Sequence, residues 1–430
     1  MIDEASIKTD REIWAVADDP STGTTDGSKD RPSRLGGNLS TFLAGLGPSV
    51  RLHLGPGEYR TNGNVLPKTF ILDAPEGGVT IKLWDNATTA HGFPHVRMFE
   101  DNQWSNFVCI SGITFDGNWE GQGAALFNGN FKIEPLCFQS VQAKIQNCTV
   151  RNYGCNASDY GPENKLECFP LTLKTFANGD REFLDPRYAN IIEPTTRLEI
   201  LDNLVEQPHF VSGGYSSGIN LQTNLGMDAG DRQPIGTRTT EAALVRGNRV
   251  YVPGGICYGC AFTESAVFED NDGIGKCGWN LDTFEGRNIT VRNNHFLGVN
   301  QGINVAPSGN GRNIRVEGNV ILLDGPFWNA VLGKSEDSWG IRGRFLSSSA
   351  AHRNLIFHPA VWPGIAIDGM TGAGNVVRSL ASAGVSQDEY DRLNTAFGEL
   401  VEKLVIKDAT SVRMREQVSE AAKILTEVLA

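Results

Sequence analysis

The sequence has no long apolar run, and its first thirty residues do not resemble a targeting segment. No stretch approaches the roughly 18 to 20 apolar residues of a membrane-spanning helix, so no membrane partner is expected. The opening residues are polar and rich in Asp and Thr, unlike a signal peptide. We therefore expect a cytoplasmic protein, a virion-associated protein, or a secreted protein recorded in its mature form.

Positive charge is also scarce. Lys and Arg total 38 against 50 Asp and Glu, which gives a formal net charge of −12. Because proteins bind phosphate backbones through clustered Lys and Arg, no nucleic-acid partner is expected. An acidic polysaccharide stays open as a ligand, since a local basic groove can lie on an acidic body.

Cysteine and histidine show no recognisable framework. Eight cysteines in a chain of 430 residues give no clear disulfide pattern. Cys257-x-x-Cys260 has no second Cys-x-x-Cys to complete a zinc site, which favours buried thiols. The seven histidines have no metal-ligand spacing. We therefore expect no cofactor and no metal, with Ca²⁺ as the exception if the protein is a lyase.

Glycine and short turn sequences are abundant. The sequence has 49 glycines and many Asn-Gly, Gly-Asn and Asp-Gly pairs, which indicate tight turns between short strands. Apolar residues make up 40% and charged residues 20%, as in a folded protein.

One pattern repeats along the chain: apolar, any, apolar, two residues, Asn, any, usually apolar. Its asparagines are Asn203, Asn248, Asn271, Asn294 and Asn319, spaced by 45, 23, 23 and 25 residues. Cys148 holds the Asn place in an earlier copy. A period near 23 with two-residue alternation predicts a solenoid of three short strands per coil, stacked at about 4.8 Å. Asn suits such a corner because it tolerates the left-handed conformation, and its amide can bond the next Asn in a ladder. A leucine-rich repeat has a similar period, but its Leu spacing and helical half are missing.

Several motifs resemble the pectin-lyase-like right-handed parallel β-helix superfamily, which includes pectate lyases, polygalacturonases and phage tailspikes. They are Val108-x-Ile110-Ser111-Gly112-Ile113-Thr114-Phe115-Asp116-Gly117-Asn118, Arg287-Asn288-Ile289-Thr290-Val291-Arg292-Asn293-Asn294, and the run over 18–32 followed by His53-Leu54-Gly55-Pro56-Gly57-Glu58-Tyr59. The resemblance covers roughly residues 12 to 378. It implies an all-β, right-handed parallel β-helix with a substrate groove along one sheet.

Three parts are expected. Residues 1–47 form an N-terminal segment with a capping helix near 38–46, and residues 48–378 form the β-helix. Residues 379–430 form a helical hairpin that opens with the capping box Ser386-x-x-Glu389 and has two apolar heptad stripes. The hairpin either covers the last coil or joins neighbouring chains.

The strands before the Asn-bearing corner align as residues 171–174, 219–222, 256–259, 279–282 and 303–306. Alternation then directs the first and third residues of each strand inward and the second and fourth outward, the second forming the main column. These residues are Thr172, Asn220, Cys257, Asn280 and Asn304, with Lys174, Gln222 and Asp282 beside them. A polar face of this kind suits sugar hydroxyls.

Glu264 and Asp282 lie 18 residues apart, less than one coil. We therefore expect them on adjacent coils, within the roughly 5 to 10 Å that separates catalytic carboxylates in glycosidases. Such a pair can divide into acid and base where the surroundings differ. Each carboxylate taken alone also fits an ordinary solvated turn. The sequence predicts Asp282 and Glu264 as the catalytic pair, with three reserves: Glu285, Asp228 and Asp231.

The named active sites of the superfamily do not carry over. A polygalacturonase would show Asn-Thr-Asp, then Asp-Asp, then Gly-His-Gly. Here Asn280-Leu281-Asp282 resembles the first, but Asn300-Gln301 replaces the pair, and no Gly-His-Gly occurs. A pectate lyase needs clustered calcium carboxylates, which are not evident, and a base, for which the candidates are Lys174, Arg232 and Arg287. His209 precedes the Asn220 strand and is a further groove candidate, although a packed histidine fits equally.

The sequence therefore predicts a carbohydrate-active enzyme that cleaves or rearranges glycosidic bonds of a poly- or oligosaccharide. A polysaccharide lyase and a non-catalytic glycan-binding solenoid such as a tail fibre are the alternatives. A β-helix fructotransferase, which works as a trimer, is compatible with these residues, so a homotrimer is among the expected assemblies. The sugar substrate rests on analogy of fold.

Overall fold

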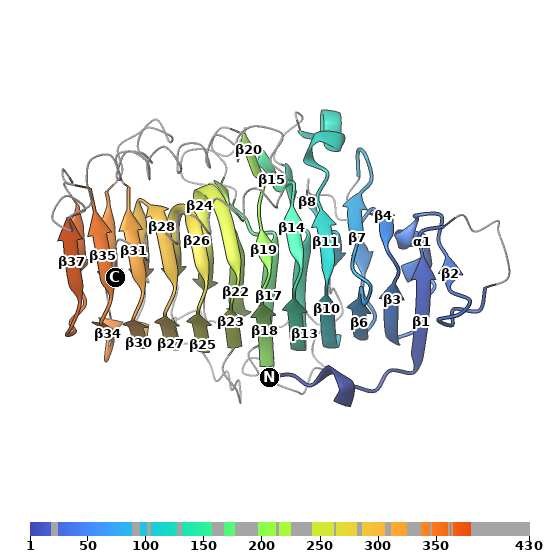
Figure 1. Ribbon diagram of the computed structural model, residues 1–430, viewed down its shortest axis with the longest axis horizontal. Coiled ribbons are helices and arrows are strands. Elements are labelled where there is room, and N and C mark those ends of the chain that lie inside the picture. Colours follow the sequence, from blue (N-terminus) through green and yellow to red (C-terminus); the bar gives the residue numbers. More distant parts are fainter. Residues whose placement is uncertain are drawn as a thin grey trace, which may run out of the picture.

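The computed structural model shows short strands stacked side by side along one axis, from β1 to β37 (Figure 1). The structure describes residues 1–18, 25–87, 95–100, 105–126, 131–156, 167–176, 197–211, 215–224, 243–261, 264–281, 286–305, 311–324, 337–344, 346–359, 362 and 364–379. Nearly all strand pairings are parallel, each joining equivalent strands of successive coils. The predicted parallel β-helix is confirmed.

Each coil contributes to three faces, which we number in the order in which the chain visits them. Face 1 comprises β1 (Arg11–Val16), β3 (Ser49–Leu54), β6 (Thr69–Asp73), β10 (Ser105–Ser111), the end of β13 (Leu136–Gln146), β18 (Arg197–Leu201), β23 (Ala243–Arg246), β25 (Glu264–Glu269), β27 (Arg287–Arg292), β30 (Gly311–Glu317), β33 (Leu346–Ser347) and β34 (Ala350–His352). Face 2 comprises β4 (Gly57–Thr61), β7 (Val79–Leu83), β11 (Ile113–Asp116), β14 (Thr149–Arg151), β19 (Leu204–Val205), the first halves of β24 (Arg249–Ala261) and β26 (Asp272–Leu281), β28 (His295–Val299), β31 (Val320–Leu323), β35 (Leu355–His358) and β37 (Val376–Ser379).

Face 3 holds the strands that the sequence placed at the substrate groove. It comprises β5 (Asn64–Val65), β9 (Phe99–Glu100), the start of β13, β17 (Leu171–Phe176), β22 (Ile219–Asn224), the second halves of β24 and β26, β29 (Gln301–Val305), β32 (Trp339–Gly343) and β36 (Ile365–Asp368). A lateral sheet is added between faces 2 and 3 in the N-terminal half, from β8 (His95–Val96), β12 (Phe131–Ile133), β15 (Tyr153–Asn156) and β20 (Pro208–Val211). A further pair is β16 (Glu167–Cys168) with β21 (Tyr215–Ser216).

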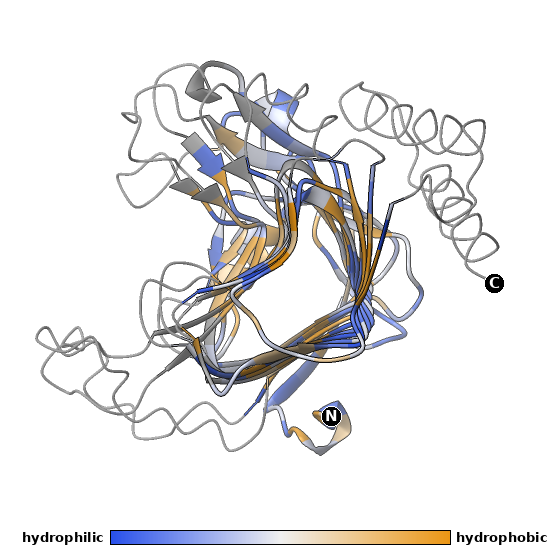
Figure 2. Cartoon of the chain, turned by 90° about the vertical axis from the view of Figure 1, so that its left-hand side faces the viewer, coloured by the Kyte–Doolittle hydropathy of each residue, from blue (hydrophilic) through white to orange (hydrophobic). Residues whose placement is uncertain are grey.

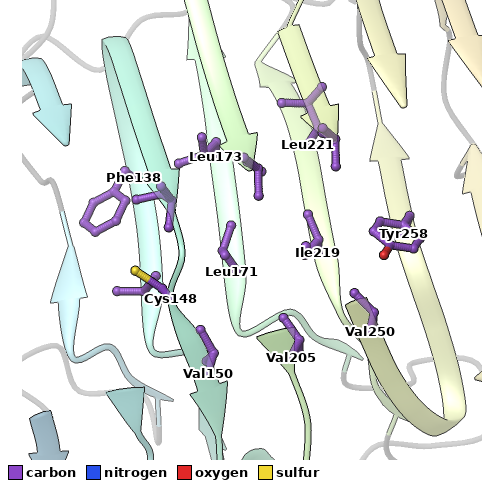
Figure 3. Close-up of a cluster of buried hydrophobic side chains, with 14 of the residues drawn as sticks. Phe138, Cys148, Val150, Leu171, Leu173, Val205, Ile219, Leu221, Val250 and Tyr258 are labelled. Carbon is purple, nitrogen blue, oxygen red and sulfur yellow. The ribbon is translucent and has the colours of Figure 1, made fainter. Parts of the chain in front are cut away.

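Apolar side chains fill the solenoid because alternate residues of each strand point inward. On face 1, Val245, Phe268, Val291 and Val316 are in register and fully buried. On face 3, Leu171, Ile219 and Tyr258 form a comparable column (Figure 3). The view along the long axis shows the coils superimposed around a common axis, with apolar residues (orange) recurring in their strands (Figure 2). No single coil can bury these residues by itself, so stacking supplies the core.

The predicted asparagine ladder occupies the corner between faces 1 and 2. Oδ1 of Asn294 accepts from the backbone N–H of Asn271 at 3.0 Å and from its Nδ2 at 2.9 Å, while Nδ2 of Asn294 donates to the Phe268 carbonyl. The same contacts repeat along the corner. The other members are Asn203, Asn248, Asn271, Asn319, Asn354 and Asn375, with the N–H of Cys148 at the N-terminal end.

One detail of the corner differs from the prediction. The left-handed residue is the one before each ladder asparagine, not the asparagine itself. These preceding residues are Asn147, Asp202, Gly247, Asp270, Asn293, Gly318, Arg353 and Gly374. The left-handed residue makes the turn, and the following asparagine, past the turn, directs its amide inward to the backbone of the adjacent coils.

The first coil is closed by the expected helix. In α1 (Leu39–Ala44), the side chain of Asn38 accepts from the N–H of Thr41 at 3.3 Å, as an N-cap residue does. Leu39 and Leu43 are buried, and the helix packs on β4 and β5. Before it, β1 pairs with β3 and β2 (Ser33–Arg34), so strand pairing begins within residues 1–47.

The N-terminal arm lies against the outer side of face 1. It contains a short 3-10 helix, η1 (Glu4–Ser6), whose Glu4 carboxylate binds Lys144 at 2.7 Å and Gln146 at 2.9 Å. Ile2 packs with Ile71, Phe107 and Cys109 in a small apolar cluster. The arm therefore covers apolar side chains that face outward from the solenoid.

At the opposite end, the last strands leave apolar side chains exposed. Ile365 is 56% exposed, Val376 40% and Val377 42%. The predicted hairpin, apart from Ser379 at the end of β37, lies outside the described residues. Among the described helices, none is long and apolar enough to cross a membrane.

Candidate functional site

The outward side of face 3 presents one residue per coil in a continuous column. In register order these residues are Glu100, Cys137, Thr172, Asn220, Gly259, Asn280, Asn304, Arg342 and Asp368. Neighbours in such a column lie about 4.8 Å apart, because that is the spacing between paired strands. The alignment predicted for the strands at 171, 219, 279 and 303 is confirmed.

The alignment of β24 was wrong by two residues. The prediction placed Ile256 beside Ile219, but Tyr258 has that register, and Gly259 occupies the outward place. Cys257 is fully buried, and burial raises the pKa of its thiol well above its ordinary value. The physical reason is a register shift between Val252 and Ile256, where the chain bends from face 2 to face 3. Cys257 is therefore not part of the outward column.

The amides and hydroxyl of the column retain hydrogen-bonding capacity. Nδ2 of Asn304 donates to Oδ1 of Asn280 at 2.7 Å, while Oδ1 of Asn304 has no hydrogen-bond partner among the described residues. Thr172 is 5% exposed and Asn220 9%. Within the described part of the chain, the structure gives no side-chain hydrogen bond for either residue. These groups donate and accept without net charge, as sugar hydroxyls do.

Charged residues lie toward the two ends of the column. At the C-terminal end, Nε of Arg342 lies 3.9 Å from Oδ2 of Asp368, and the guanidinium lies 4.5 Å from the centre of the Trp339 ring. Such a cation over an indole ring is a favourable contact. The described centre of the column, from Cys137 to Asn304, is uncharged.

At the N-terminal end, Glu100 belongs to a buried ion-pair cluster with Arg97, Lys132 and Glu134. Nη1 of Arg97 lies 3.3 Å from Glu100, its Nε lies 3.5 Å from Glu134, and Lys132 lies 2.7 Å from Glu134. Burial alone lowers the pKa of Lys132, but the Glu134 carboxylate outweighs it and the pKa is raised. The pKa of Arg97 is likewise raised against its own burial by neighbouring negative charge.

Sequence reasoning missed this cluster. Its residues come from short strands and corners outside the asparagine repeat. More than 30 residues of chain separate Glu100 from Glu134. Arg97 with Glu100 and Lys132 with Glu134 are local pairs, and the stacking of successive coils brings the two pairs together. The local signs were Arg97-x-x-Glu100 and Lys132-x-Glu134, and such spacings of opposite charges are common on protein surfaces.

Of the predicted catalytic pair, the structure describes the backbone of Glu264 but not Asp282. Glu264 begins β25 on face 1, in register with Arg287. Asp282 follows Leu281, the last residue of β26. In the chain, Glu264 thus comes three residues after Ala261, the last residue of β24, and Asp282 comes one residue after the last residue of β26. The side chain of Glu264 lies outside the description, as do residues Asp282, Glu285, Asp228, Asp231 and Arg232.

The remaining predicted binding residues have different placements. Lys174 and Gln222 are paired in register on face 3, with side chains outside the description. His209 lies on β20 of the lateral sheet, where its ring stacks on Trp119 at 5.4 Å with an interplanar angle of 7°. Among the described residues, no three His, Cys, Asp or Glu side chains lie together as a metal-binding group, and the cysteines are buried free thiols.

Comparison with known proteins gave no match to a family model and none to a curated protein. Solved structures with similarity include a GH136 lacto-N-biosidase from Eubacterium ramulus, with a TM-score of 0.41 and 11% identity over 86% of this chain and 67% of that one. The surface adhesin PfbA of Streptococcus pneumoniae has a TM-score of 0.37 and 13% identity over 76% of this chain and 81% of its own. The A-module of a mannuronan C-5 epimerase from Azotobacter vinelandii has a TM-score of 0.33 and 13% identity over 76% of this chain and 90% of its own. At these values no function is transferred to this chain.

Proposed function

We propose that face 3 binds a poly- or oligosaccharide lying along the solenoid axis, and that the protein acts on a glycosidic bond of that ligand. The observation that supports this is the uncharged column of Thr172, Asn220, Asn280 and Asn304. A linear ligand along the axis meets one such side chain about every 4.8 Å, apart from Gly259. Amide and hydroxyl groups both donate and accept, which matches the two roles of a sugar hydroxyl.

The column can hold a sugar but cannot move protons, so catalysis needs carboxylates beside it. We propose Asp282 and Glu264 as the general acid and base, because each follows in the chain the end of a face 3 strand, β26 for Asp282 and β24 for Glu264, and these two strands are neighbours in the sheet. A separation of about 5 Å would favour a retaining mechanism and one of about 6.5 to 9.5 Å an inverting mechanism. Glu285, Asp228 and Asp231 are the reserve candidates.

Glu100 and Glu134 are less suitable for this role. Both carboxylates already contact cations, with Arg97 between them and Lys132 on Glu134. Proton transfer by either one would break an ion pair in a largely buried place, which is costly. The cluster is better suited to fixing the corner between the lateral sheet and face 3.

The test is a screen of the full-length protein against an oligosaccharide panel, measuring reducing ends and the absorbance of unsaturated products together. On a substrate found in this way, Asp282→Asn and Glu264→Gln should each lose at least about 100-fold in kcat, the lower end for a general acid or base. The matched control is Glu269→Gln, which removes a carboxylate paired with Arg292 on the outer side of face 1. If both groove variants turn over substrate at the wild-type rate, this assignment is wrong.

Two alternatives give different results in the same screen. A polysaccharide lyase would form unsaturated products, depend on a base among Lys174, Arg232 and Arg287, and respond to Ca²⁺. A non-catalytic glycan-binding solenoid would bind a saccharide and release no product. The oligomeric state, for which a homotrimer remains a proposal, is checked by light scattering of the full chain.

A further inference from the structure

The inference concerns the one place in the middle of the face 3 column that has no side chain. Gly259 stands in register between Asn220 and Asn280. A Cβ built at Gly259 would lie 2.9 Å from Cε1 and 3.0 Å from Cζ of Phe169. Such distances are shorter than real Cβ contacts. The outer edge of the Phe169 ring therefore lies directly over the Gly259 backbone, and only glycine leaves room for it.

Phe169 comes from a different coil. It precedes β17, whereas Gly259 belongs to β24, with β22 between them in the stacking order. The ring is only partly buried, although Leu171 and Leu173 of the same coil are fully buried in the core. Phe169 is thus an aromatic ring on the outer side of the sheet, lying across neighbouring coils instead of packing inside the solenoid.

Asn220 flanks the same spot. Its Oδ1 lies 3.1 Å from the point where the Gly259 Cβ would stand, beside the ring edge. Asn220 is 9% exposed, and its amide makes no hydrogen bond to the part of the chain that the structure describes. A mostly buried amide that is still reached by water can exchange that water for hydrogen bonds to a ligand. The ring and the open amide together indicate a place where a ligand supplies the missing contacts.

We propose that Phe169 and Asn220 form a subsite for a single uncharged pyranose ring, with Gly259 as its floor. The apolar C–H face of the sugar stacks on the exposed face of Phe169, and its hydroxyls exchange hydrogen bonds with Asn220. This rests on the proposed saccharide binding by face 3 and adds the position and the charge class of one sugar unit.

The choice of an uncharged sugar follows from the charges along the column. Asn220 lies three coils after Glu100 and four before Arg342, or about 14 Å and 19 Å at the strand spacing. Glu100 is neutralised by Arg97, and Arg342 lies beside Asp368. Thr172 and Asn280, the nearest side chains of the column on either side, are uncharged. Among the described side chains of this column, no charged group is within reach of a carboxylate on a sugar bound here; Lys174 and Asp282, which the sequence placed beside the column, lie outside the described side chains.

The experiment is calorimetric titration of the full-length protein with cellotetraose, mannotetraose, galactotetraose and N-acetylchitotetraose, with trigalacturonate as the charged comparison. We expect a neutral tetrasaccharide to bind, and Phe169→Ala to raise its Kd at least about tenfold, as for loss of an aromatic anchor. Phe169→Tyr keeps the ring and should change Kd less than about threefold. Gly259→Ala should weaken binding because its Cβ displaces the ring. The matched control is Trp84→Ala, which removes a 38% exposed aromatic ring beside Arg60 after β7.

The outcomes separate this inference from the function on which it rests. If Asn280→Ala and Asn304→Ala weaken binding while Phe169→Ala and Gly259→Ala leave it unchanged, face 3 binds the saccharide and the Phe169 subsite is wrong. If trigalacturonate binds more tightly than every neutral probe, the charge class is overturned. If no probe binds at all, both the saccharide function and this subsite fail. Circular dichroism and the Tm of Phe169→Ala show whether that variant is folded. If Phe169→Ala does not fold, Gly259→Ala, compared with Phe169→Tyr, tests the contribution of the ring instead.

Discussion

Two columns of asparagine run along this solenoid with the same coil spacing, and they differ in what their amides contact. In the corner ladder, Asn248 donates from Nδ2 to the Ile200 carbonyl and to Oδ1 of Asn271, and its own Oδ1 accepts from Asn203. On face 3, among the described side chains of the column, the amides of Asn220, Asn280 and Asn304 share one hydrogen bond, from Asn304 to Asn280. The same residue type is therefore saturated in one column and open in the other.

The difference comes from the direction of the side chain. A ladder asparagine follows a left-handed residue and points into the corner, where the backbone of two neighbouring coils is within reach. An outward asparagine of a strand meets only the side chains of adjacent coils, because the backbone there is already paired in the sheet. Buried amides with all partners supply rigidity, whereas amides with spare capacity remain available to a ligand.

The largest expected effect concerns the end of the ladder. Asn375 is the last ladder asparagine described, and Ile365, Val376 and Val377 are exposed beyond it. Ending the chain after Ser379 should leave this strand edge and its apolar residues uncovered and cause aggregation, measured by light scattering. A truncated protein that stays monomeric with unchanged stability would exclude a capping role for residues 380–430. A change from trimer to monomer alone would favour an oligomer role.

The next effect compares one residue from each column. Asn294→Leu removes the acceptor for the Asn271 N–H and the donor to the Phe268 carbonyl, both buried, and should cost roughly 1 to 3 kcal/mol of unfolding free energy. Asn280→Leu, the matched control, loses one partly buried side-chain bond and should cost much less. Denaturant unfolding of both variants provides the measurement. Equal costs would remove the distinction between the columns.

The reverse comparison uses ligand binding. Asn280→Ala and Asn304→Ala should change the unfolding free energy by no more than about 0.5 to 1 kcal/mol, since the pair is only partly buried. Both should nevertheless weaken binding of the saccharide that the wild-type protein binds, in calorimetric titration. Asn294→Ala should show the opposite pattern, with lower stability and unchanged affinity of the folded fraction. Unaltered affinity in both face 3 variants would show that this column does not bind the ligand.

The smallest effect concerns coils that precede the ladder and are held by other side-chain pairs. On the outer side of face 1, His53 contacts Asp73 at 2.5 Å and Glu12 at 3.0 Å. Burial lowers the pKa of His53, but the contacts with Asp73 and Glu12 outweigh it, and the pKa is raised above 6.5. Because the folded pKa is the higher one, this contribution is fully present below the unfolded pKa and is lost as the pH rises through the folded pKa.

His53→Gln should therefore be less stable than the wild-type protein at about pH 5.5, with the difference shrinking toward about pH 8.5. Urea unfolding at both values checks this. The difference between wild type and variant is the quantity to measure, because Asp272 also raises the pKa of His295. That second histidine makes the stability of both proteins depend on pH in the same direction. A difference that stays constant with pH would contradict the proposed role of protonated His53.

The sequence was sufficient for the coils whose repeat is regular. Asn203 to Asn319 were found because each follows two apolar residues in the same frame, and that frame is local. Asn354 and Asn375 were missed, although they continue the ladder. Asn354 comes 35 residues after Asn319. Ser349 stands where the repeat before Asn354 needs an apolar residue, and Gly372 does so before Asn375. A ladder asparagine is recognised in the structure by its stacking on the neighbouring coil. Extra residues within a coil change the spacing in the sequence, so a search at a fixed period misses that asparagine.

The candidate site was less accessible from the sequence. The alternation of polar and apolar residues gave the outward places of Thr172, Asn220, Asn280 and Asn304, because side-chain direction in a strand depends only on position. It failed in β24, where a register shift between Val252 and Ile256 moved Gly259 into the column in place of Cys257. Local alternation cannot reveal how many residues a bend absorbs.

By itself, the sequence determined the parallel solenoid, the corner ladder and which side of face 3 is polar, since all three follow from a short repeat of apolar and amide residues. Only the tertiary structure decided which residues of different coils meet. Phe169 lies over Gly259 beside Asn220, and Arg97 meets Glu134, because stacking brings together segments separated by tens of residues. Their contacts depend on register and on the length of the intervening bends, which are properties of the assembled coils and not of any one segment.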